Sequence, residues 1–235
     1  MKLNEAIILA GGMGTRLKSV VKEVPKPMAP INGRPFLEYL LDHLIKNGIE
    51  RVIFSVGFKS NIIADHFGKK YQDCELIYVY EDEPLGTGGA VKEAMNSVHG
   101  ENVLVTNGDS LFITDIQGQF VFHQNRGADV TLGLKSMVDF DRYGTVILDN
   151  NSRIHNFREK ESISKGLING GVYIFKVEAF TSIDFPQKFS VENNYFQTHT
   201  KVSKFFGYQS DGYFLDIGIP EDFAKAQEDF LKFHK

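Results

Sequence analysis

Several signals that would assign this protein to other classes are missing from its sequence. The chain of 235 residues contains one cysteine, Cys74, so no disulfide can form within it, which favours a reducing compartment. Its seven histidines are scattered and form no Cys/His cluster at the spacing of a zinc site. No apolar run reaches the length of a membrane span, and the N-terminus lacks the pattern of a signal peptide. We therefore expect a cytoplasmic protein with no membrane partner.

Two well-known glycine-rich motifs are also absent. A P-loop needs an earlier glycine and a following Ser or Thr, and the single Gly68-Lys69 pair lacks both. A dinucleotide-binding fingerprint needs a third glycine where Leu17 stands, and a helix that begins directly after the loop. Pro25 and Pro27 follow instead, and prolines oppose a helix there. The chain therefore matches neither the P-loop nucleotide-binding proteins nor the dinucleotide-binding Rossmann proteins.

Composition and charge describe a globular protein with one unusual segment. At 235 residues the chain is long enough for one large α/β domain with a full core, and we expect residues 1–235 to form a single domain. The net charge of −4 argues against nucleic acid as a partner. The first 35 residues nevertheless carry +4, from six Lys or Arg and two acids, which indicates a local anion site.

Strand-like and helix-like patterns alternate through the first half of the chain. Alternating strands and helices predict a mostly parallel sheet with helices on both faces. The second half is predicted to add strands with few helices between them, which wall a pocket. Apolar, β-branched runs predict strands at residues 5–9, 51–56, 75–80, 102–107, 130–134, 144–148, 153–158, 167–175, 202–207 and 213–217. Helical periodicity predicts helices at residues 36–47, 61–67, 90–97, 117–126 and 221–233.

Three glycines follow the first predicted strand directly, in the segment Leu9–Leu17. Glycines let a backbone approach a ligand and point successive N–H groups at phosphate oxygens. Arg16 adds a forked donor for the same anion, and Lys26 adds a compact charge. The glycines alone also fit an ordinary turn after a strand. Together with the two cations they predict a triphosphate site.

Two aspartates lie at the ends of predicted strands that are far apart in the sequence. Asp109 follows the strand at residues 102–107, and Asp216 lies between apolar residues and a glycine. An isolated aspartate at such a position usually forms a turn or a helix cap. With a phosphate loop at the same edge of the sheet, the pair is better suited to Mg²⁺, which binds through one or two carboxylates and substrate phosphates.

The segment Glu81–Ala90 has the features of a base-binding loop. Its glycines permit close approach of a flat base, and Pro84 stiffens it. Guanine presents two donors on its pairing edge, and the Glu81 carboxylate can accept both, whereas an amide suits uracil or thymine better. Asp82 and Glu83 are better explained as a solvated turn. The segment therefore predicts a guanine nucleotide.

Candidate residues for a second substrate lie in the second half of the chain. A carboxylate and an amide, such as Glu159 and Asn169, can pair with sugar hydroxyls, and Lys160 can bind a phosphate. Gly144 lets backbone approach the same pocket. On their own, Glu159 and Lys160 also fit a surface ion pair, and Gly144 fits an ordinary turn.

These motifs together resemble those of the sugar-1-phosphate nucleotidyltransferase family, over nearly the whole chain. The resemblance implies the nucleotide-diphospho-sugar transferase fold, a Rossmann-like mixed and mostly parallel α/β sheet with helices on both faces. It also implies Mg²⁺-dependent transfer of a nucleotidyl group. The matching motifs are Leu9–Leu17 with Pro25–Pro27, Glu81–Ala90, Asn107–Asp109, Glu159-Lys160, Asn169–Gly171, and Asp216–Gly218 with Pro220–Asp222.

Matched position by position, the resemblance implies a role for each motif. Residues 1–130 would bind mainly the nucleotide and residues 131–235 mainly the sugar phosphate. The catalytic residues would be Arg16 and Lys26, and the metal ligands Asp109 and Asp216. The sugar phosphate would contact Gly144, Glu159, Lys160 and Asn169. The nucleotide would contact Leu9, Ala10, Gly11, Gly12, Gly14, Thr15, Glu81, Pro84, Gly86, Thr87 and Gly108.

Within the family, the pattern from Glu81 to Thr87 resembles the guanylyltransferases. The segments Lys26–Pro30 and Pro35–Tyr39 in this short chain resemble the branch that acts on D-glycero-α-D-manno-heptose 1-phosphate. The expected substrates are GTP and that sugar phosphate, giving GDP-heptose for bacterial surface glycans, and a homodimer is a possible assembly. Mannose 1-phosphate or a UTP-dependent reaction stays open as an alternative. A non-catalytic nucleotide-sugar sensor is the alternative from another class.

Overall fold

The computed structural model describes residues 2–12, 17, 21, 23–158 and 163–234. The strands are β1 (Glu5–Leu9), β2 (Pro30–Ile31), β3 (Arg34–Pro35), β4 (Arg51–Val56), β5 (Lys70–Tyr71), β6 (Cys74–Tyr80), β7 (Asn102–Asn107), β8 (Ser110–Phe112), β9 (Val130–Phe140), β10 (Thr145–Leu148), β11 (Ile154–Arg158), β12 (Ile163–Lys176), β13 (Phe205–Ser210) and β14 (Phe214–Asp216). The α-helices are α1 (Phe36–Lys46), α2 (Ser60–Phe67), α3 (Gly86–Met95), α4 (Ile116–Arg126), α5 (Val177–Thr181), α6 (Gln197–His199) and α7 (Pro220–Asp229). Shorter turns are the 3-10 helices η2 (Lys26–Met28) and η4 (Phe230–His234) and the π-helix η3 (Glu192–Phe196).

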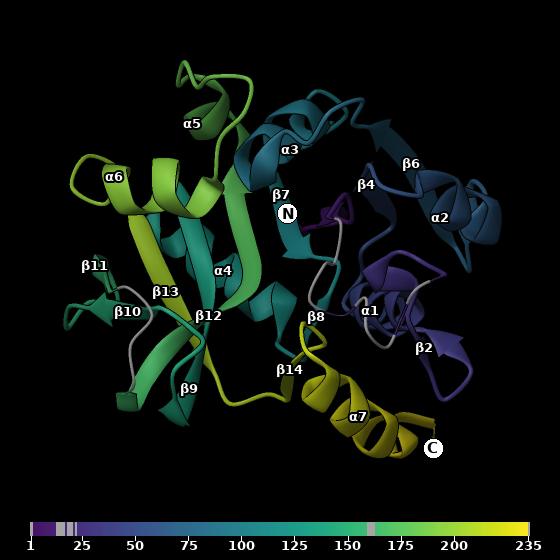
Figure 1. Cartoon of the computed structure of the whole chain (residues 1–235). Coiled ribbons are helices and arrows are strands. Elements are labelled where there is room, and N and C mark those ends of the chain that lie inside the picture. Colours follow the sequence, from purple (N-terminus) through teal and green to yellow (C-terminus); the bar gives the residue numbers. More distant parts are fainter. Residues whose placement is uncertain (1, 13–16, 18–20, 22, 159–162, 235) are drawn as a thin grey trace.

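The described residues form a central sheet of ten strands (Figure 1). Eight of them lie in the order β11-β10-β12-β7-β1-β4-β6-β5, and β9 pairs with β12 and β13. Strand β1 is parallel to both of its neighbours, β4 and β7, and its Ile8 lies opposite Phe54 and Thr106. Strand β12 joins this parallel group as an antiparallel neighbour of β7. The expected mixed, mostly parallel sheet is confirmed.

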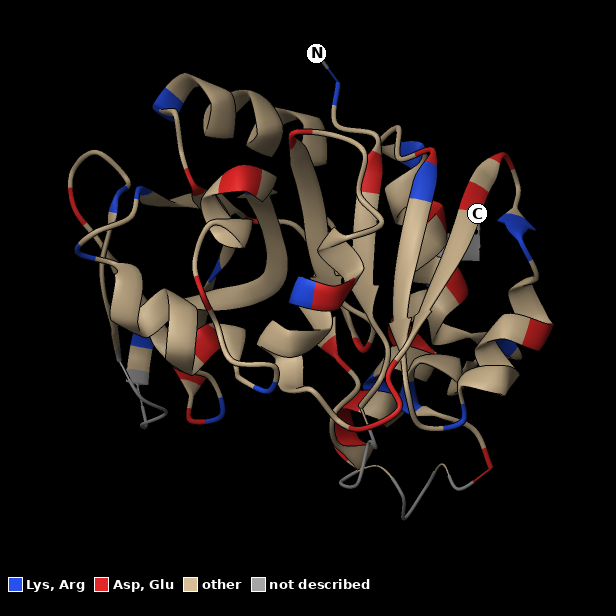
Figure 2. Ribbon diagram, turned by 90° about the horizontal axis from the view of Figure 1, so that it is seen from above, with Lys and Arg blue, Asp and Glu red and all other residues tan. Residues whose placement is uncertain are grey.

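Helices cover both faces of the sheet because successive strand residues point to opposite sides (Figure 1). In β1, Ile8 belongs to the core that includes residues of α1, α2, α4 and α7. Its neighbour Ile7 belongs to the core that includes residues of α3, α5 and η3. The central strands carry Lys, Arg, Asp and Glu mainly near their ends (Figure 2). Strands buried on both faces therefore leave the polar chemistry to the loops at the sheet edge.

The structure departs from the sequence predictions in several places, and the short strands β2, β3, β5 and β8 were not predicted. Strand β14 pairs with β8 in a separate two-stranded ribbon and so does not extend the main sheet. Helix α3 begins at Gly86, four residues before the predicted start. Helical turns α5, η3 and α6 occupy a region where few helices were predicted. Their sequences have weak helix propensity, and packing of Phe180 and Phe196 against the sheet overrides it.

Candidate functional site

A cavity of about 490 Å³ lies at the carboxyl ends of β1, β6 and β7, the edge where parallel α/β sheets bind ligands. We call it the glycine-loop cavity. Loops that are far apart in the sequence meet there, as the motif spacing predicted. Its lining is Leu9, Ala10, Gly11, Gly12, Lys26, Pro27, Glu81, Pro84, Gly86, Thr87, Ala90, Asn107, Asp109, Glu192 and Gly218.

Backbone hydrogen bonds fix the start of the glycine loop, at the end of β1, against β4 and the residues after β7. The Ala10 N–H donates to the Ser55 carbonyl of β4 at 2.8 Å, and the Gly108 N–H donates to the Leu9 carbonyl at 2.9 Å. A side chain at Gly11 would displace the Glu81 carboxylate from its present position, so glycine at this position leaves room for it. Gly14, Thr15 and Arg16 of the predicted triphosphate site lie outside the described residues.

Lys26 brings the two predicted metal ligands together. Its Nζ donates to Asp109 Oδ2 at 2.6 Å and to Asp216 Oδ1 at 3.2 Å, and the lysine is buried. The flanking prolines lead into the short helix η2, which carries Lys26. The β8–β14 ribbon supplies Asp216 by pairing it with Ser110, directly after Asp109. The sequence motif predicted that Lys26 binds phosphates. In the structure its ammonium group instead forms ion pairs with both carboxylates.

The electrostatics of this cluster favour an additional cation. Burial raises the pKa of Asp216, the nearby Asp109 carboxylate raises it further, and Lys26 opposes both effects. Two carboxylates and one ammonium leave a net negative charge with unused acceptor lone pairs. No group of three or more His, Cys, Asp or Glu side chains that could hold a metal occurs among the described residues. A cation bound here would therefore have these two carboxylates as its side-chain ligands, which suits Mg²⁺.

Glu81 is fixed in the glycine-loop cavity by donors from two directions. The Ser55 hydroxyl donates to Oε1 at 2.8 Å, and the Leu85 N–H donates to Oε2 at 3.1 Å. Each carboxylate oxygen keeps a second acceptor lone pair. Pro84 and Gly86 line the same wall of the cavity. The carboxylate is therefore oriented in advance for two further donors.

Thr87 is held from the second half of the chain. Its Oγ1 donates to Glu192 Oε2 at 2.6 Å and accepts the Val191 N–H at 3.0 Å. Gly88 has no room for a side chain because the Phe189 ring packs on it. These contacts explain why the helix begins at Gly86, although the glycines disfavour one.

A second cavity, of about 360 Å³, adjoins the first, and we call it the Asn169 cavity. Asn169 donates to the Tyr173 hydroxyl at 2.9 Å and accepts the Gly171 N–H at 2.9 Å. The pairing of β12 with β9 is interrupted by a bulge between Asn169 and Tyr173, where Gly171 adopts a φ of +73°. Its lining is Asn107, Asp109, Ser110, Arg142, Tyr143, Gly144, Asn169, Gly170, Gly171, Tyr173, Glu192, Phe214, Asp216, Gly218 and Ile219.

Aromatic hydroxyls in the Asn169 cavity stay protonated at neutral pH. Burial raises the pKa of Tyr143 to about 12, with a smaller contribution from the Asp216 carboxylate. Burial likewise raises the pKa of Tyr173, and the charge of Glu192 adds to it. Gly144 lines the cavity as predicted, whereas Glu159 and Lys160 lie outside the described residues.

The two cavities share Asn107, Asp109, Glu192 and Gly218, so they form one elongated site. The cluster of Lys26, Asp109 and Asp216 lies at their junction. Glu192, Arg142 and Ser110 also line this site and belong to none of the predicted motif positions. Glu192 could not be found, because it follows a Ser-Val pair in a segment that carries no strand or helix period.

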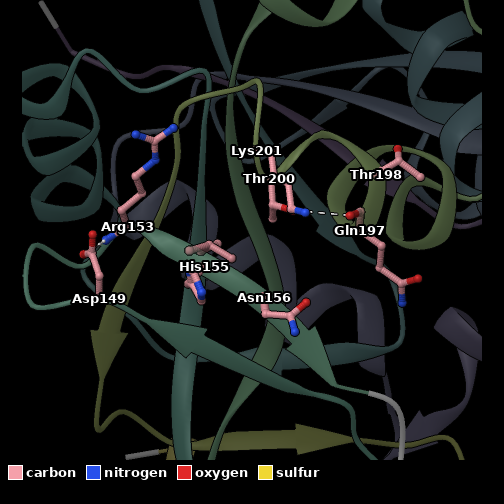
Figure 3. A pocket seen from close by; sticks show the side chains of 9 residues that line it. Asp149, Arg153, His155, Asn156, Gln197, Thr198, Thr200 and Lys201 are labelled. Carbon is pink, nitrogen blue, oxygen red and sulfur yellow. Dashed lines mark hydrogen bonds between the residues drawn. The ribbon is translucent and has the colours of Figure 1, made fainter.

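A larger cavity of about 860 Å³ lies elsewhere and shares no residue with this site (Figure 3). Mostly polar residues line it, from the turn before β11, from β11 itself and from the segment around α6. The Arg153 guanidinium and the Gln197 amide point in different directions, so the labelled side chains do not converge on one point (Figure 3). The lining residues are Asp149, Arg153, Ile154, His155, Asn156, Gln197, Thr198, Thr200 and Lys201.

One further property concerns membranes. Within the described ranges, every helix is too short or too polar to cross a bilayer.

Comparisons with known proteins agree with this geometry. The family model of the nucleotidyl transferases matches residues 5–232. D-glycero-α-D-manno-heptose 1-phosphate guanylyltransferase of Aneurinibacillus thermoaerophilus is 49% identical over 96% of this chain and 97% of its own length. The enzyme of the same name from Campylobacter jejuni is 43% identical over 93% of this chain and 96% of its own.

A solved structure supports the same assignment. The crystal structure of HddC from Yersinia pseudotuberculosis complexed with GMP-PN superposes with a TM-score of 0.87 at 35% identity. The match covers 97% of this chain and 100% of that chain. The motifs, the fold and these relatives lead to one conclusion: the chain belongs to the nucleotidyl transferase family.

Proposed function

We propose that this protein transfers GMP from GTP to D-glycero-α-D-manno-heptose 1-phosphate and releases pyrophosphate, forming GDP-heptose. The observation that carries the proposal is the pair of adjoining cavities, with Lys26, Asp109 and Asp216 at their junction. A reaction between two phosphorylated substrates needs two neighbouring sites and a charged centre between them. The near full-length similarity to two enzymes of this name supports the choice of substrates.

Base selection is assigned to Glu81. Its oxygens, each already fixed by one protein donor, retain acceptor lone pairs for N1–H and the exocyclic amine of guanine. Gly11 and Gly12 lie in the same cavity and bring backbone close to the nucleotide. The predicted contacts of Leu9, Ala10, Pro84, Gly86, Thr87 and Gly108 with the nucleotide, and those of Gly14 and Thr15, belong to the same proposal.

The sugar phosphate is assigned to the Asn169 cavity. Asn169 and the backbone at Gly144 would contact the sugar, together with Glu159 and Lys160. The cavity adjoins the carboxylate cluster, so a phosphate bound in it can approach the α-phosphorus of the nucleotide. In this arrangement residues 131–235 serve mainly the acceptor and residues 1–130 mainly the nucleotide, within one domain.

The reaction is an in-line displacement. An oxygen of the sugar phosphate forms a bond to the α-phosphorus of GTP, while the bond from that phosphorus to the bridging oxygen breaks and pyrophosphate leaves. The attacking phosphate is already anionic, so no general base is needed. Catalysis then depends on positioning and on neutralising charge. Arg16 is assigned to the triphosphate.

The carboxylates fit a divalent cation, because two of them converge on one point and keep unused lone pairs. We assign Asp109 and Asp216 as the ligands of Mg²⁺. When bound, the cation would neutralise phosphate charge that builds up during transfer. Lys26 positions both carboxylates for that role. The free and buried Cys74 agrees with a reducing, cytoplasmic location.

The test is a panel assay of pyrophosphate release in the presence of Mg²⁺. Each of the four nucleoside triphosphates is combined with manno-heptose, mannose and glucose 1-phosphates. We expect strong release with GTP and the heptose phosphate only, and loss of release with EDTA. Release with UTP would overturn the assignment of Glu81, and preference for mannose 1-phosphate would overturn the choice of sugar. Nucleotide binding without release from any pair would favour a sensor.

A further inference from the structure

Glu192 lies at the boundary of the two cavities and has no role in the mechanism above. It is the first residue of η3 and lines both the glycine-loop cavity and the Asn169 cavity. The residue is half-buried. A carboxylate in this position, in a site for anionic substrates, requires a physical explanation.

One of its oxygens is fixed by two hydroxyl groups. Oε2 accepts from Thr87 Oγ1 at 2.6 Å and from Ser190 Oγ at 2.7 Å. Each of these hydroxyls in turn accepts a backbone N–H, from Val191 at 3.0 Å and from Asn193 at 3.2 Å. Each hydroxyl proton is therefore free to point at Glu192, and the carboxylate is held in one orientation.

The other oxygen, Oε1, has no hydrogen-bond partner in the part of the chain that the structure describes. Nor is Glu192 paired with a Lys or Arg there. Because Oε2 is already satisfied by two donors, Oε1 is the acceptor that remains for a ligand. An oriented carboxylate oxygen beside a cavity is a strong acceptor for an O–H donor.

The chemistry of the site restricts what this oxygen can meet. Phosphate groups would be repelled by it. A metal role is unsupported, since Glu192 forms no three-membered ligand group with Asp109 and Asp216 among the described residues. The donors of the base are already assigned to Glu81. The remaining donors are hydroxyl groups, those of the ribose of the nucleotide and those of the acceptor sugar.

The acceptor sugar supplies such hydroxyls on the correct side. Glu192 lies near Tyr173, whose pKa its charge helps to raise, and Tyr173 accepts from Asn169. Amide, phenol and carboxylate thus all line the Asn169 cavity. We infer that Glu192 Oε1 accepts a hydrogen bond from a ring hydroxyl of the sugar 1-phosphate. Glu192 is therefore a specificity-determining residue for the acceptor, an inference that rests on the proposed function.

The variant Glu192→Gln tests this directly. The glutamine carbonyl keeps both hydroxyl donors, from Thr87 and Ser190, when it takes the place of Oε2, and the amide NH₂ then replaces Oε1. An acceptor becomes a donor with little change of shape. We expect the KM for manno-heptose 1-phosphate to rise about tenfold or more, the loss typical of a charged hydrogen bond. The KM for GTP should change less than about twofold, since the base and triphosphate contacts are intact.

Two control variants separate this role from a purely structural one. Glu178→Gln removes a carboxylate that lines neither cavity and whose side chain is 85% exposed, and it should leave both KM values unchanged. Ser190→Ala removes one of the hydroxyls that hold Oε2 and leaves Oε1 in the cavity. If Glu192 only ties α3 to η3, the Ser190 and Glu192 variants should behave alike, with lowered melting temperatures and unchanged KM values.

The outcomes keep the two proposals distinguishable. Turnover by the wild-type enzyme with GTP and the heptose phosphate decides the proposed function. Where wild type turns over, an unchanged acceptor KM in Glu192→Gln, or a rise for GTP alone, overturns the inference about Glu192. Where it does not, calorimetric titration of manno-heptose, mannose and glucose 1-phosphates into both proteins decides. Equal binding, or no binding to wild type, overturns the inference as well.

Discussion

Replacing Glu81 by glutamine should weaken recognition of guanine specifically. The Leu85 N–H can only donate, so the glutamine carbonyl is expected to face it, and the amide NH₂ then faces the Ser55 hydroxyl, which can accept. The side chain then presents one acceptor and one donor to the base. Guanine has two donors on that edge, so one hydrogen bond is lost and two N–H groups face each other.

The expected loss follows from that geometry. A hydrogen bond to a charged group contributes about 1.5–3 kcal/mol, so kcat/KM for GTP should fall roughly 10- to 150-fold in Glu81→Gln. ITP lacks the exocyclic amine of guanine and provides a matched substrate. If Glu81 contacts both donors, the effects of Glu81→Gln and of ITP should not add, because they remove parts of one interaction.

Steady-state pyrophosphate release with GTP and with ITP, for both proteins, measures all four values. Ser55→Ala is the control, since it removes a neighbour of the carboxylate and leaves both acceptor oxygens. A change of less than about threefold with GTP, or fully additive effects, would refute the role of Glu81 in reading the base.

Two other predictions concern the carboxylate cluster. Lys26→Met removes the cation between Asp109 and Asp216, so turnover should fall by orders of magnitude. Without metal, the free energy of unfolding measured in urea should fall by about 3 kcal/mol, and Mg²⁺ should restore it. Unchanged turnover would remove Lys26 from the mechanism. Burial and Asp109 raise the pKa of Asp216 above its ordinary value of 3.8, so the folded state binds its proton more tightly than the unfolded state. The Asp216 carboxylate therefore lowers the free energy of unfolding increasingly as the pH rises from its ordinary pKa through its raised pKa. Without metal, Asp216→Asn should have a higher melting temperature than wild type at pH 7 but not at pH 3. Equal melting temperatures at both pH values would contradict the raised pKa.

The central strands of the sheet could be predicted from the sequence because they are continuous apolar, β-branched runs. Strands β4 and β7 have the predicted bounds, since β-branched runs buried on both faces leave little ambiguity. The motifs that follow β1, β6 and β7 were expected to meet, because the carboxyl ends of parallel strands share an edge. Their common cavity is what that topology requires.

Other parts of the site depend on contacts that have no local signal. Glu192 lies in a π-helical turn whose sequence is rich in asparagine, and its position is set by Thr87, more than 100 residues earlier. The partner of β14 could not be predicted either, because a three-residue strand carries too little pattern to define a register. Long-range pairing fixed both.

The bulge in β12 divides the strand into two parts that pair with different sets of neighbours. Residues after the bulge keep an unbroken register with β7, from Val172 opposite Thr106 to Lys176 opposite Asn102. Residues before it pair with the outer part of β9, where Asn169 lies opposite Leu134. A change in length or sequence before the bulge can thus reshape the Asn169 cavity while the pairing of β12 with β7 keeps its alignment. The bulge thereby separates a stretch of β12 that can vary in sequence from one whose register with β7 is fixed by the core of the sheet.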